Sequence, residues 1–248
     1  CIDQQDGRMY FTVTAEGKPL RKRRYFFSEC FYVLTKILQY KVKKDDESLL
    51  KARKYYDFLM SMYINPASDP YKITPKTIAE TRETRALGGP MILLNITNVL
   101  IEIDSVNKEK YACIAKQLIK DIFTFRHEKT GLMLEGRLVD GSFYFDSATG
   151  RIVNPGHSIE LSWFLADTAH LLGDRELLKQ AEDIFIKAYN FGKDEEFGGI
   201  LYFKDIEGKP VEAYEHDMKL WWVHTEAITA TIKFYDYTGE EKYLSMFK

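Results

Sequence analysis

The chain has 248 residues, of which 45% are hydrophobic and 29% charged, and its formal net charge at pH 7 is −2. These values are ordinary for a globular protein with one large core or two smaller ones. The near-neutral charge excludes a basic footprint for nucleic acid, and no apolar run of about 18 residues exists to span a membrane. Cys1, Cys30 and Cys113 are too widely spaced for a disulfide framework or a zinc motif. A reducing, cytoplasmic compartment fits this cysteine usage best.

The predicted elements begin with a short β-hairpin and continue mainly as helices. Residues 8–14 alternate in a β-prone pattern, and residues 15–19 are turn-like. Apolar spacing then predicts helices over residues 25–41, from 46 through the fifties, 90–103, 108–125, 154–172, from 175 through 188, 221–237 and from 240 onward. A polar loop is predicted over residues 64–85, and short strands are predicted within 132–145 and over 198–203.

The helical part of the sequence repeats. The steps between four polar residues, each in the first half of an apolar helix, are 66, 65 and 66 residues: Glu29, Asn95, Glu160 and Glu226. The turns at 173–174 and 239–240 are also 66 residues apart. Matching steps at several positions predict a repeated structural unit.

Each repeat joins a helix that is apolar on most sides to an amphipathic helix. Because the first kind must be buried and the second can face solvent, the pattern predicts inner and outer helices of stacked αα-hairpins. We therefore expect an all-α fold, an (α/α)6 toroid, in which polar residues near the inner N-termini converge on one mouth. Six hairpins would need about 390 residues. The sequence holds about four, so residues 1–248 are expected to form one partial barrel domain. The start without Met and the end at Lys248 favour this over an open four-hairpin stack that is complete as it stands.

One inner helix begins with a polar motif, Asn154-Pro155-Gly156-His157-Ser158-Ile159-Glu160. Asn154 is a good N-cap, and Pro155 suits the first helical position. His157 and Glu160, three residues apart, share one helix face. Polar groups at the first turn of a buried helix are costly without a purpose, so the pair is a candidate site; the alternative is a capped core helix with a satisfied polar pair.

A second motif opens the next inner helix. Trp222 and Glu226 are four apart and share a face, a pairing in which an indole stacks on a sugar ring and a carboxylate accepts hydroxyl protons. Trp221 and His224 are interpreted as packing residues.

These residues carry a resemblance to a known family. The sequence from Asn154 to Leu165 and the segment 218–227 resemble the N-acylglucosamine 2-epimerases, also called renin-binding proteins. Residues 27–32 and 90–95 are similar to the same family, and the resemblance runs over nearly the whole chain. The related cellobiose 2-epimerases carry a histidine in the segment corresponding to 90–95, which this sequence lacks.

The resemblance implies interconversion of N-acetylglucosamine and N-acetylmannosamine by proton removal and return at carbon 2. It assigns His157 and Glu226 to catalysis, and Glu160 to positioning that histidine or the sugar. Glu160, Trp222, Glu29 and Asn95 are predicted to bind the substrate. A second histidine and a substrate-holding arginine lie, in the family, in segments that this chain lacks, so the chain alone is expected to be inactive.

The resemblance also bears on cofactors and partners. No metal is indicated, since Glu215, His216 and Asp217 are consecutive and cannot all point one way. No phosphate-binding glycine loop is found, so the ATP stimulation typical of the family would be allosteric. The expected partner is a small amino sugar, with a homodimer as one compatible assembly and with no nucleic acid or membrane.

Other functions remain open at this stage. A glycoside hydrolase on the same fold could use Glu160 and Glu226 as its two carboxylates, although His157 favours proton abstraction. A non-catalytic, renin-binding type of interaction protein is a second alternative. An aldose–ketose isomerase, or a cellobiose or mannose 2-epimerase of the same superfamily, differs mainly in substrate or in where the proton returns.

Overall fold

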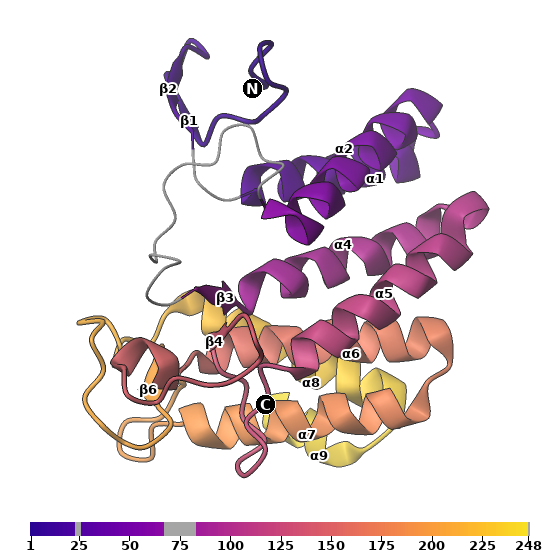
Figure 1. Ribbon diagram of the computed structural model, residues 1–248. Helices are drawn as coiled ribbons and strands as arrows, with labels where there is room; N and C mark the ends of the chain where they lie inside the picture. Colours follow the sequence, from indigo (N-terminus) through magenta and orange to yellow (C-terminus); the bar gives the residue numbers. More distant parts are fainter. Residues whose placement is uncertain (23–25, 67–82, 248) are drawn as a thin grey trace. The chain divides into compact units, whose positions relative to one another are not determined.

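The computed structural model describes residues 1–22, 26–66 and 83–247, and its regular structure is almost entirely helical (Figure 1). The helices are α1 Phe27–Lys43, α2 Asp46–Ile64, α4 Gly88–Ile103, α5 Lys108–Phe123, α6 Pro155–Leu172, α7 Arg175–Gly192, α8 Trp221–Thr238 and α9 Glu241–Phe247, with 3-10 turns η2 Ser105–Asn107 and η3 Ala148–Arg151. Short antiparallel strands pair as β1 Thr12–Val13 with β2 Pro19–Arg21, β3 Thr84–Ala86 with β4 Gly136–Leu138, and β5 Ile152–Val153 with β6 Lys204–Asp205.

The chain divides into two compact units, Cys1–Ile78 with Val99–Glu109, and Ala79–Asn98 with Lys110–Lys248. In the first unit α1 packs against α2. Arg53 of α2 donates two hydrogen bonds to the buried Asp104, at 2.7 and 2.6 Å. This bidentate pair secures α2 to the segment that follows α4.

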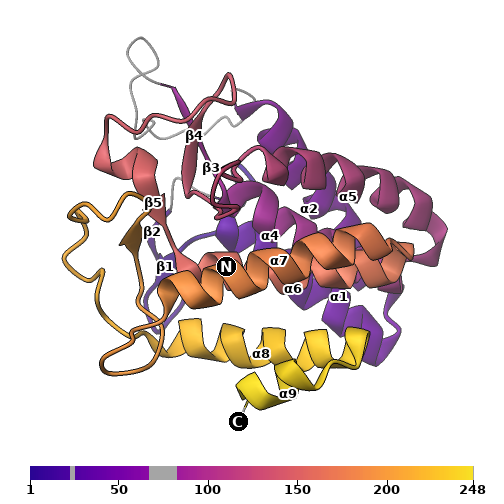
Figure 2. The same cartoon turned by 90° about the horizontal axis from the view of Figure 1, so that it is seen from below.

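The second unit is built around α6. Both α7 and α8 run alongside α6, as Figure 2 shows. Asn154 caps α6 by accepting a hydrogen bond from the backbone N–H of His157 at 3.0 Å, and Pro155 is its first residue. Gly173 ends the helix in the left-handed conformation, with φ 68°. Asp174 then caps α7, so the predicted turn is confirmed.

Equivalent residues of successive repeats meet each other. The amide of Asn98 on α4 donates to the carbonyl of Phe164 on α6 at 2.9 Å, 66 residues away. Lys233 on α8 donates to Asp167 on α6 at 2.7 Å, again 66 residues away. The predicted repeat is therefore a packing register, in which corresponding turns of neighbouring inner helices lie at the same depth.

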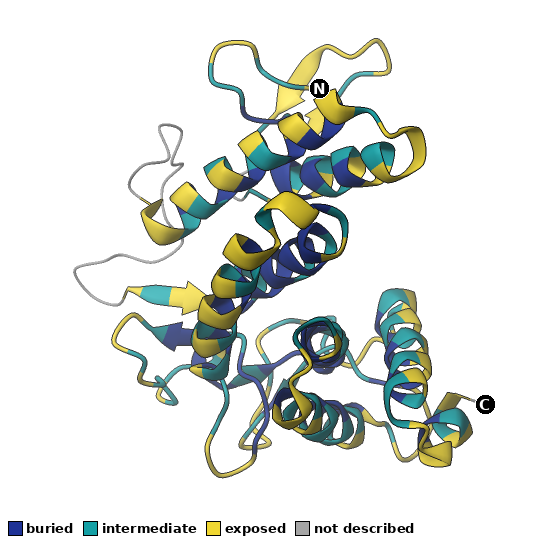
Figure 3. Ribbon diagram, turned by 90° about the vertical axis from the view of Figure 1, so that its right-hand side faces the viewer, coloured by how far each residue is buried: buried dark blue, intermediate teal, exposed yellow. Residues whose placement is uncertain are grey.

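Burial separates α6 from α7 as the sequence indicates, but α1, also expected to be a buried inner helix, exposes Phe31 by 61% and Leu38 by 53%. Along α6 only His170 is exposed, whereas α7 shows one buried face that includes Leu177, Ala181 and Ile184 (Figure 3). The expectation that α8 is covered on most sides is wrong for one face, where Trp221 is 78% and Ile228 48% exposed.

Some strand and loop boundaries differ from expectation. The strand predicted over 198–203 does not form; an isolated bridge joins Lys193 to Ile200, and β6 follows at 204–205. The reason is the backbone of Gly198 and Gly199, whose φ values of 71° and 80° are incompatible with an extended strand. Within the loop predicted at 64–85, residues 67–82 lie outside the described part, and 84–85 belong to strand β3.

The described residues contain no single helix long and apolar enough to cross a membrane. Taken together, the segments Gly88–Ile103 and Ser105–Phe123 are long and apolar enough for a span, but they are bent by 110° relative to each other.

Replacing Asn98 should destabilise the second unit. Its Oδ1 accepts from Thr168 at 2.8 Å and its amide donates to Phe164. Asn98→Ala removes both of these buried hydrogen bonds between α4 and α6 and should cost about 1–3 kcal/mol. The measurement is the urea unfolding midpoint. Asn95→Ala, at a partly exposed position one turn earlier, is the matched control and should leave the midpoint nearly unchanged; equal losses in both variants would contradict the proposed register.

Candidate functional site

The first turn of α6 holds the candidate site's histidine. His157 Nδ1 lies 3.0 Å from Oε2 of Glu135, and the two side chains are 32% and 22% exposed. The backbone of Glu135 is held on both sides, donating to Ile152 at 3.0 Å and accepting from Leu87 at 3.1 Å. A carboxylate on a fixed loop therefore orients the imidazole and selects the tautomer with hydrogen on Nδ1.

A glycine brings the next inner helix close to this turn. A Cβ on Gly156 would lie 2.7 Å from the indole of Trp222 and 2.8 Å from Val223. Only glycine accommodates this approach of α8 to α6. As a result the Trp222 ring centroid lies 5.3 Å from that of His157, and Tyr202 meets the indole edge-on at 5.9 Å.

Glu226 is oriented from the opposite helix. The indole N–H of Trp163, on α6, donates to Glu226 Oε2 at 2.7 Å. Because α6 and α8 pack in register, the first two turns of both helices present their polar residues to one region. His157 and Trp222 are thus in contact, and Glu160 lies near enough to His157 and Glu226 to interact with both charges.

The acids of this region have altered protonation equilibria. Burial raises the pKa of Glu160, and the negative charges of Glu226 and Glu135 raise it further. The charge of His157 lowers it in part, and the pKa is about 7. Burial also raises the pKa of Glu226, against the hydrogen bond from Trp163. For His157 burial acts to lower the pKa, but the charge and hydrogen bond of Glu135, with the charge of Glu160, raise it overall. The cluster therefore contains a carboxyl group, that of Glu160, with a pKa near neutrality, as acid–base chemistry requires.

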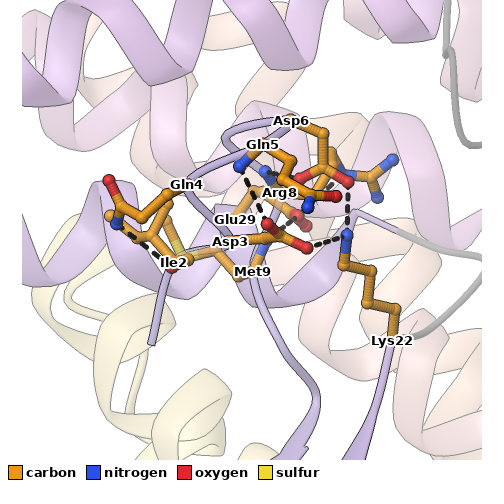
Figure 4. A network of polar contacts seen from close by, with 9 residues as sticks. All are labelled: Ile2, Asp3, Gln4, Gln5, Asp6, Arg8, Met9, Lys22 and Glu29. Carbon is orange, nitrogen blue, oxygen red and sulfur yellow. Dashed lines mark hydrogen bonds and ion pairs between the residues drawn. The ribbon is translucent and has the colours of Figure 1, made fainter. Parts of the chain in front are cut away.

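Glu29 lies in the first unit, where it is 1% exposed. Its Oε1 accepts from Arg8 Nε and from the backbone N–H of Met9, both at 2.8 Å (Figure 4). Lys22 pairs with Asp3 and Asp6 in the same network. The carboxylate serves an internal ion pair in this structure, and its predicted contact with substrate stays a prediction.

Asn95 is partly exposed on α4. It lies three residues before Asn98, on the same helix face, and Asn98 bonds to α6. Within the described residues no hydrogen bond links Asn95 to His157, Glu160 or Glu226. Its role toward a substrate also stays a prediction.

The structure adds residues that spacing did not reveal. Glu135, rather than Glu160, makes the hydrogen bond to His157, and it comes from a loop 22 residues earlier. No pattern in the sequence pairs the two. Trp221, interpreted as a packing residue, is 78% exposed, which corrects that interpretation. His224 has both ring nitrogens engaged, by the Leu220 carbonyl at 2.8 Å and the Ile200 N–H at 3.1 Å.

A search of the described residues finds no group of three or more His, Cys, Asp and Glu side chains arranged to hold a metal ion.

The helical hairpins, with the polar first turns of their inner helices, have the fold of the (α/α)6-barrel sugar epimerases. A crystal structure of a sugar epimerase from a ruminal bacterium superposes with a TM-score of 0.77, at 20% identity, over 100% of this chain and 63% of that one. The chain belongs to the N-acylglucosamine 2-epimerase family, whose family model matches residues 1–248.

Among individual relatives, N-acylglucosamine 2-epimerase of Rattus norvegicus is 31% identical over 238 residues, which is 96% of this chain and 56% of the relative. Cellobiose 2-epimerase of Ruminococcus albus is 22% identical over 255 residues, covering 100% of this chain and 64% of the relative. The chain therefore spans little more than half the length of the N-acylglucosamine 2-epimerase it matches.

Removing the charge of Glu135 should lower the pKa of His157. Glu135→Gln retains the shape but loses the carboxylate that stabilises the imidazolium, so the pKa of His157 should fall. Proton NMR titration of the imidazole signals measures it, with His157→Gln assigning the signal. Glu128→Gln, at an exposed turn, is the control; a His157 titration unchanged by Glu135→Gln would contradict the pairing.

Replacing Glu160 should stabilise the chain at high pH. Because its folded-state pKa of about 7 lies above the ordinary value of 4.5 for a glutamate, the native state binds more protons between these values and stability falls as pH rises through that window. Glu160→Gln should therefore gain about 1–2 kcal/mol at pH 8, after discounting for partial exposure, and almost nothing near pH 4.5. Urea denaturation at both pH values tests this, with exposed Glu212→Gln as control. A gain independent of pH would reject the argument.

Proposed function

We propose that this protein is a sugar 2-epimerase that interconverts N-acetylglucosamine and N-acetylmannosamine. The proposal is supported by its family and by the rat relative that bears this name. The observation that carries it is the His157–Glu135 pair beside Glu160 and Trp222. Such a set suits removal of a proton from carbon next to a carbonyl group.

In the proposed reaction His157 is the base. Its Nδ1–H donates to Glu135, so the lone pair on Nε2 is available to take the proton from carbon 2 of the open-chain sugar. The electron pair of the broken C–H bond forms the enolate, and Glu135 stabilises the imidazolium. Inversion requires that a second acid return a proton to the opposite face of the enolate.

The remaining side chains are assigned to the sugar. Glu160, with a pKa of about 7, is protonated in part of the population near neutrality and can donate to the developing enolate oxygen. Glu226, fixed by Trp163, is proposed as the catalytic carboxylate facing the hydroxyl groups. Trp222 offers an indole face against the C–H surface of the ring, and Glu29 and Asn95 are the further proposed substrate contacts.

Finer features belong to the same proposal. ATP would act as an allosteric activator, with no part in the chemistry, and the protein would work in the cytoplasm as a homodimer. An aldose–ketose isomerase with the same base would return the proton to carbon 1, so products separate the two activities.

The test uses the protein in its natural, full-length form, incubated with N-acetylmannosamine in deuterated water. We expect N-acetylglucosamine carrying deuterium at carbon 2, detected by NMR. His157→Asn should lower kcat by roughly 10³-fold, because general acid–base groups contribute about 10²–10⁴. Since the base must be neutral, kcat should rise with pH through the raised pKa of His157.

Other products point to other functions. Deuterium at carbon 1 of a ketose indicates an isomerase. Hydrolysis of a glycoside without exchange at carbon 2 indicates a glycosidase. Neither exchange nor turnover, with or without ATP, would leave a binding protein and reject the epimerase proposal.

A further inference from the structure

A row of side chains continues from the candidate site along the packed faces of α6 and α8. The members have helical spacings of 4, 3, 7 and 4 residues: Trp163, Asp167 and His170 on α6, and Glu226, Lys233 and Tyr237 on α8. Residues at these spacings share one face of each helix.

The centre of the row is the ammonium group of Lys233. It lies 4.9 Å from the centroid of the Trp163 ring. It also donates to both carboxylate oxygens of Asp167, at 2.7 and 2.8 Å. The Tyr237 hydroxyl donates to the same carboxylate at 2.7 Å, and His170 stacks on Tyr237 with centroids 4.8 Å apart. The cation is therefore held in place against the indole.

A cation near an aromatic ring attracts its electrons. In an indole this makes the N–H more positive and a stronger hydrogen-bond donor. The N–H of Trp163 is the group that bonds to Glu226, at 2.7 Å. Lys233 can thus influence Glu226 without touching it.

We propose that Lys233 is a positioning residue for Glu226, acting through the indole of Trp163, and that Asp167 holds the lysine in the geometry this requires. The catalytic importance of Glu226 rests on the proposed function, but the physical coupling does not. Loss of the cation should weaken the Trp163 hydrogen bond and favour the protonated form of Glu226.

Other charged groups surround this carboxylate. Glu160 on α6 interacts electrostatically with Glu226, and His157 and Glu135 in turn act on Glu160. Lys233 lies against the ring of Trp163 and is bound to Asp167. The same variants are therefore also made in a Glu160→Gln background, so that the ionisation of Glu160 cannot be mistaken for that of Glu226.

The experiment follows the three tryptophan indole N–H signals of the 248-residue chain by proton–nitrogen NMR correlation during a pH titration. Substitution of each tryptophan by Phe assigns the signals. In the unaltered chain the Trp163 signal should lie downfield and follow the ionisation of Glu226. Lys233→Met should move this signal upfield and raise its titration midpoint by about half a unit.

Lys233→Arg retains a cation and should restore most of the unaltered behaviour. The matched control is Lys204→Met, because Lys204 has a similar contact with Phe191, at 4.7 Å, remote from Trp163 in sequence. It should leave the Trp163 titration unchanged. Should Lys233→Met fail to fold, Asp167→Asn tests the same coupling and should shift the midpoint in the same direction.

An unchanged Trp163 signal and midpoint in a folded Lys233→Met or Asp167→Asn variant would overturn the proposal. Equal shifts in Lys204→Met would overturn it too, as a general charge effect. Absence of epimerase turnover would reject the proposed function. The NMR titration would still show whether Lys233 acts on Glu226 through Trp163.

Discussion

The packing of α6 against α8 in register is the constraint on which the candidate site depends. Asp167 meets Lys233 across 66 residues, and Gly156 lets Trp222 approach the first turn of α6. Equivalent turns therefore lie at equal depth. If the two helices slid by one turn, the Trp163–Glu226 hydrogen bond and the His157–Trp222 contact would both be lost.

This register concentrates acidic groups, which is electrostatically unfavourable. Glu135, Glu160 and Glu226 cannot all remain ionised and buried without compensation. Three features relieve the repulsion: the raised pKa of Glu160, the hydrogen bond from Trp163 to Glu226 and the imidazole beside Glu135. Groups with these properties are also the ones that acid–base chemistry uses.

The two ends of α6 and α8 carry different kinds of residue. The carboxyl-terminal parts of α6 and α8 hold the helices together through Lys233, Asp167 and Tyr237, whereas their first two turns carry the candidate reactive groups. In the proposed coupling, a packing contact adjusts the candidate catalytic carboxylate of Glu226. Trp163 joins the two, since its ring lies against the lysine and its N–H reaches the carboxylate.

Much of the architecture follows from local patterns in the sequence. Apolar periodicity placed the helices, Asn154 and Gly173 marked the ends of α6, and the 66-residue step indicated which residues share a depth. These features depend on neighbours within a few turns or on repetition, both of which can be read along one chain. The grouping of His157, Glu160, Trp222 and Glu226 was predicted from the same kind of local spacing and repetition, and their roles stay a prediction.

What only the tertiary structure decided are contacts between segments with no common spacing. Glu135 reaches His157 because loop backbone bonds to Ile152 and Leu87 fix it there, and nothing in a one-dimensional pattern encodes that encounter. The enclosure of Glu29 by Arg8 and Met9 is of the same kind. The protonation of Glu160 depends on burial and on three other charges, and these distances exist only after the chain has folded.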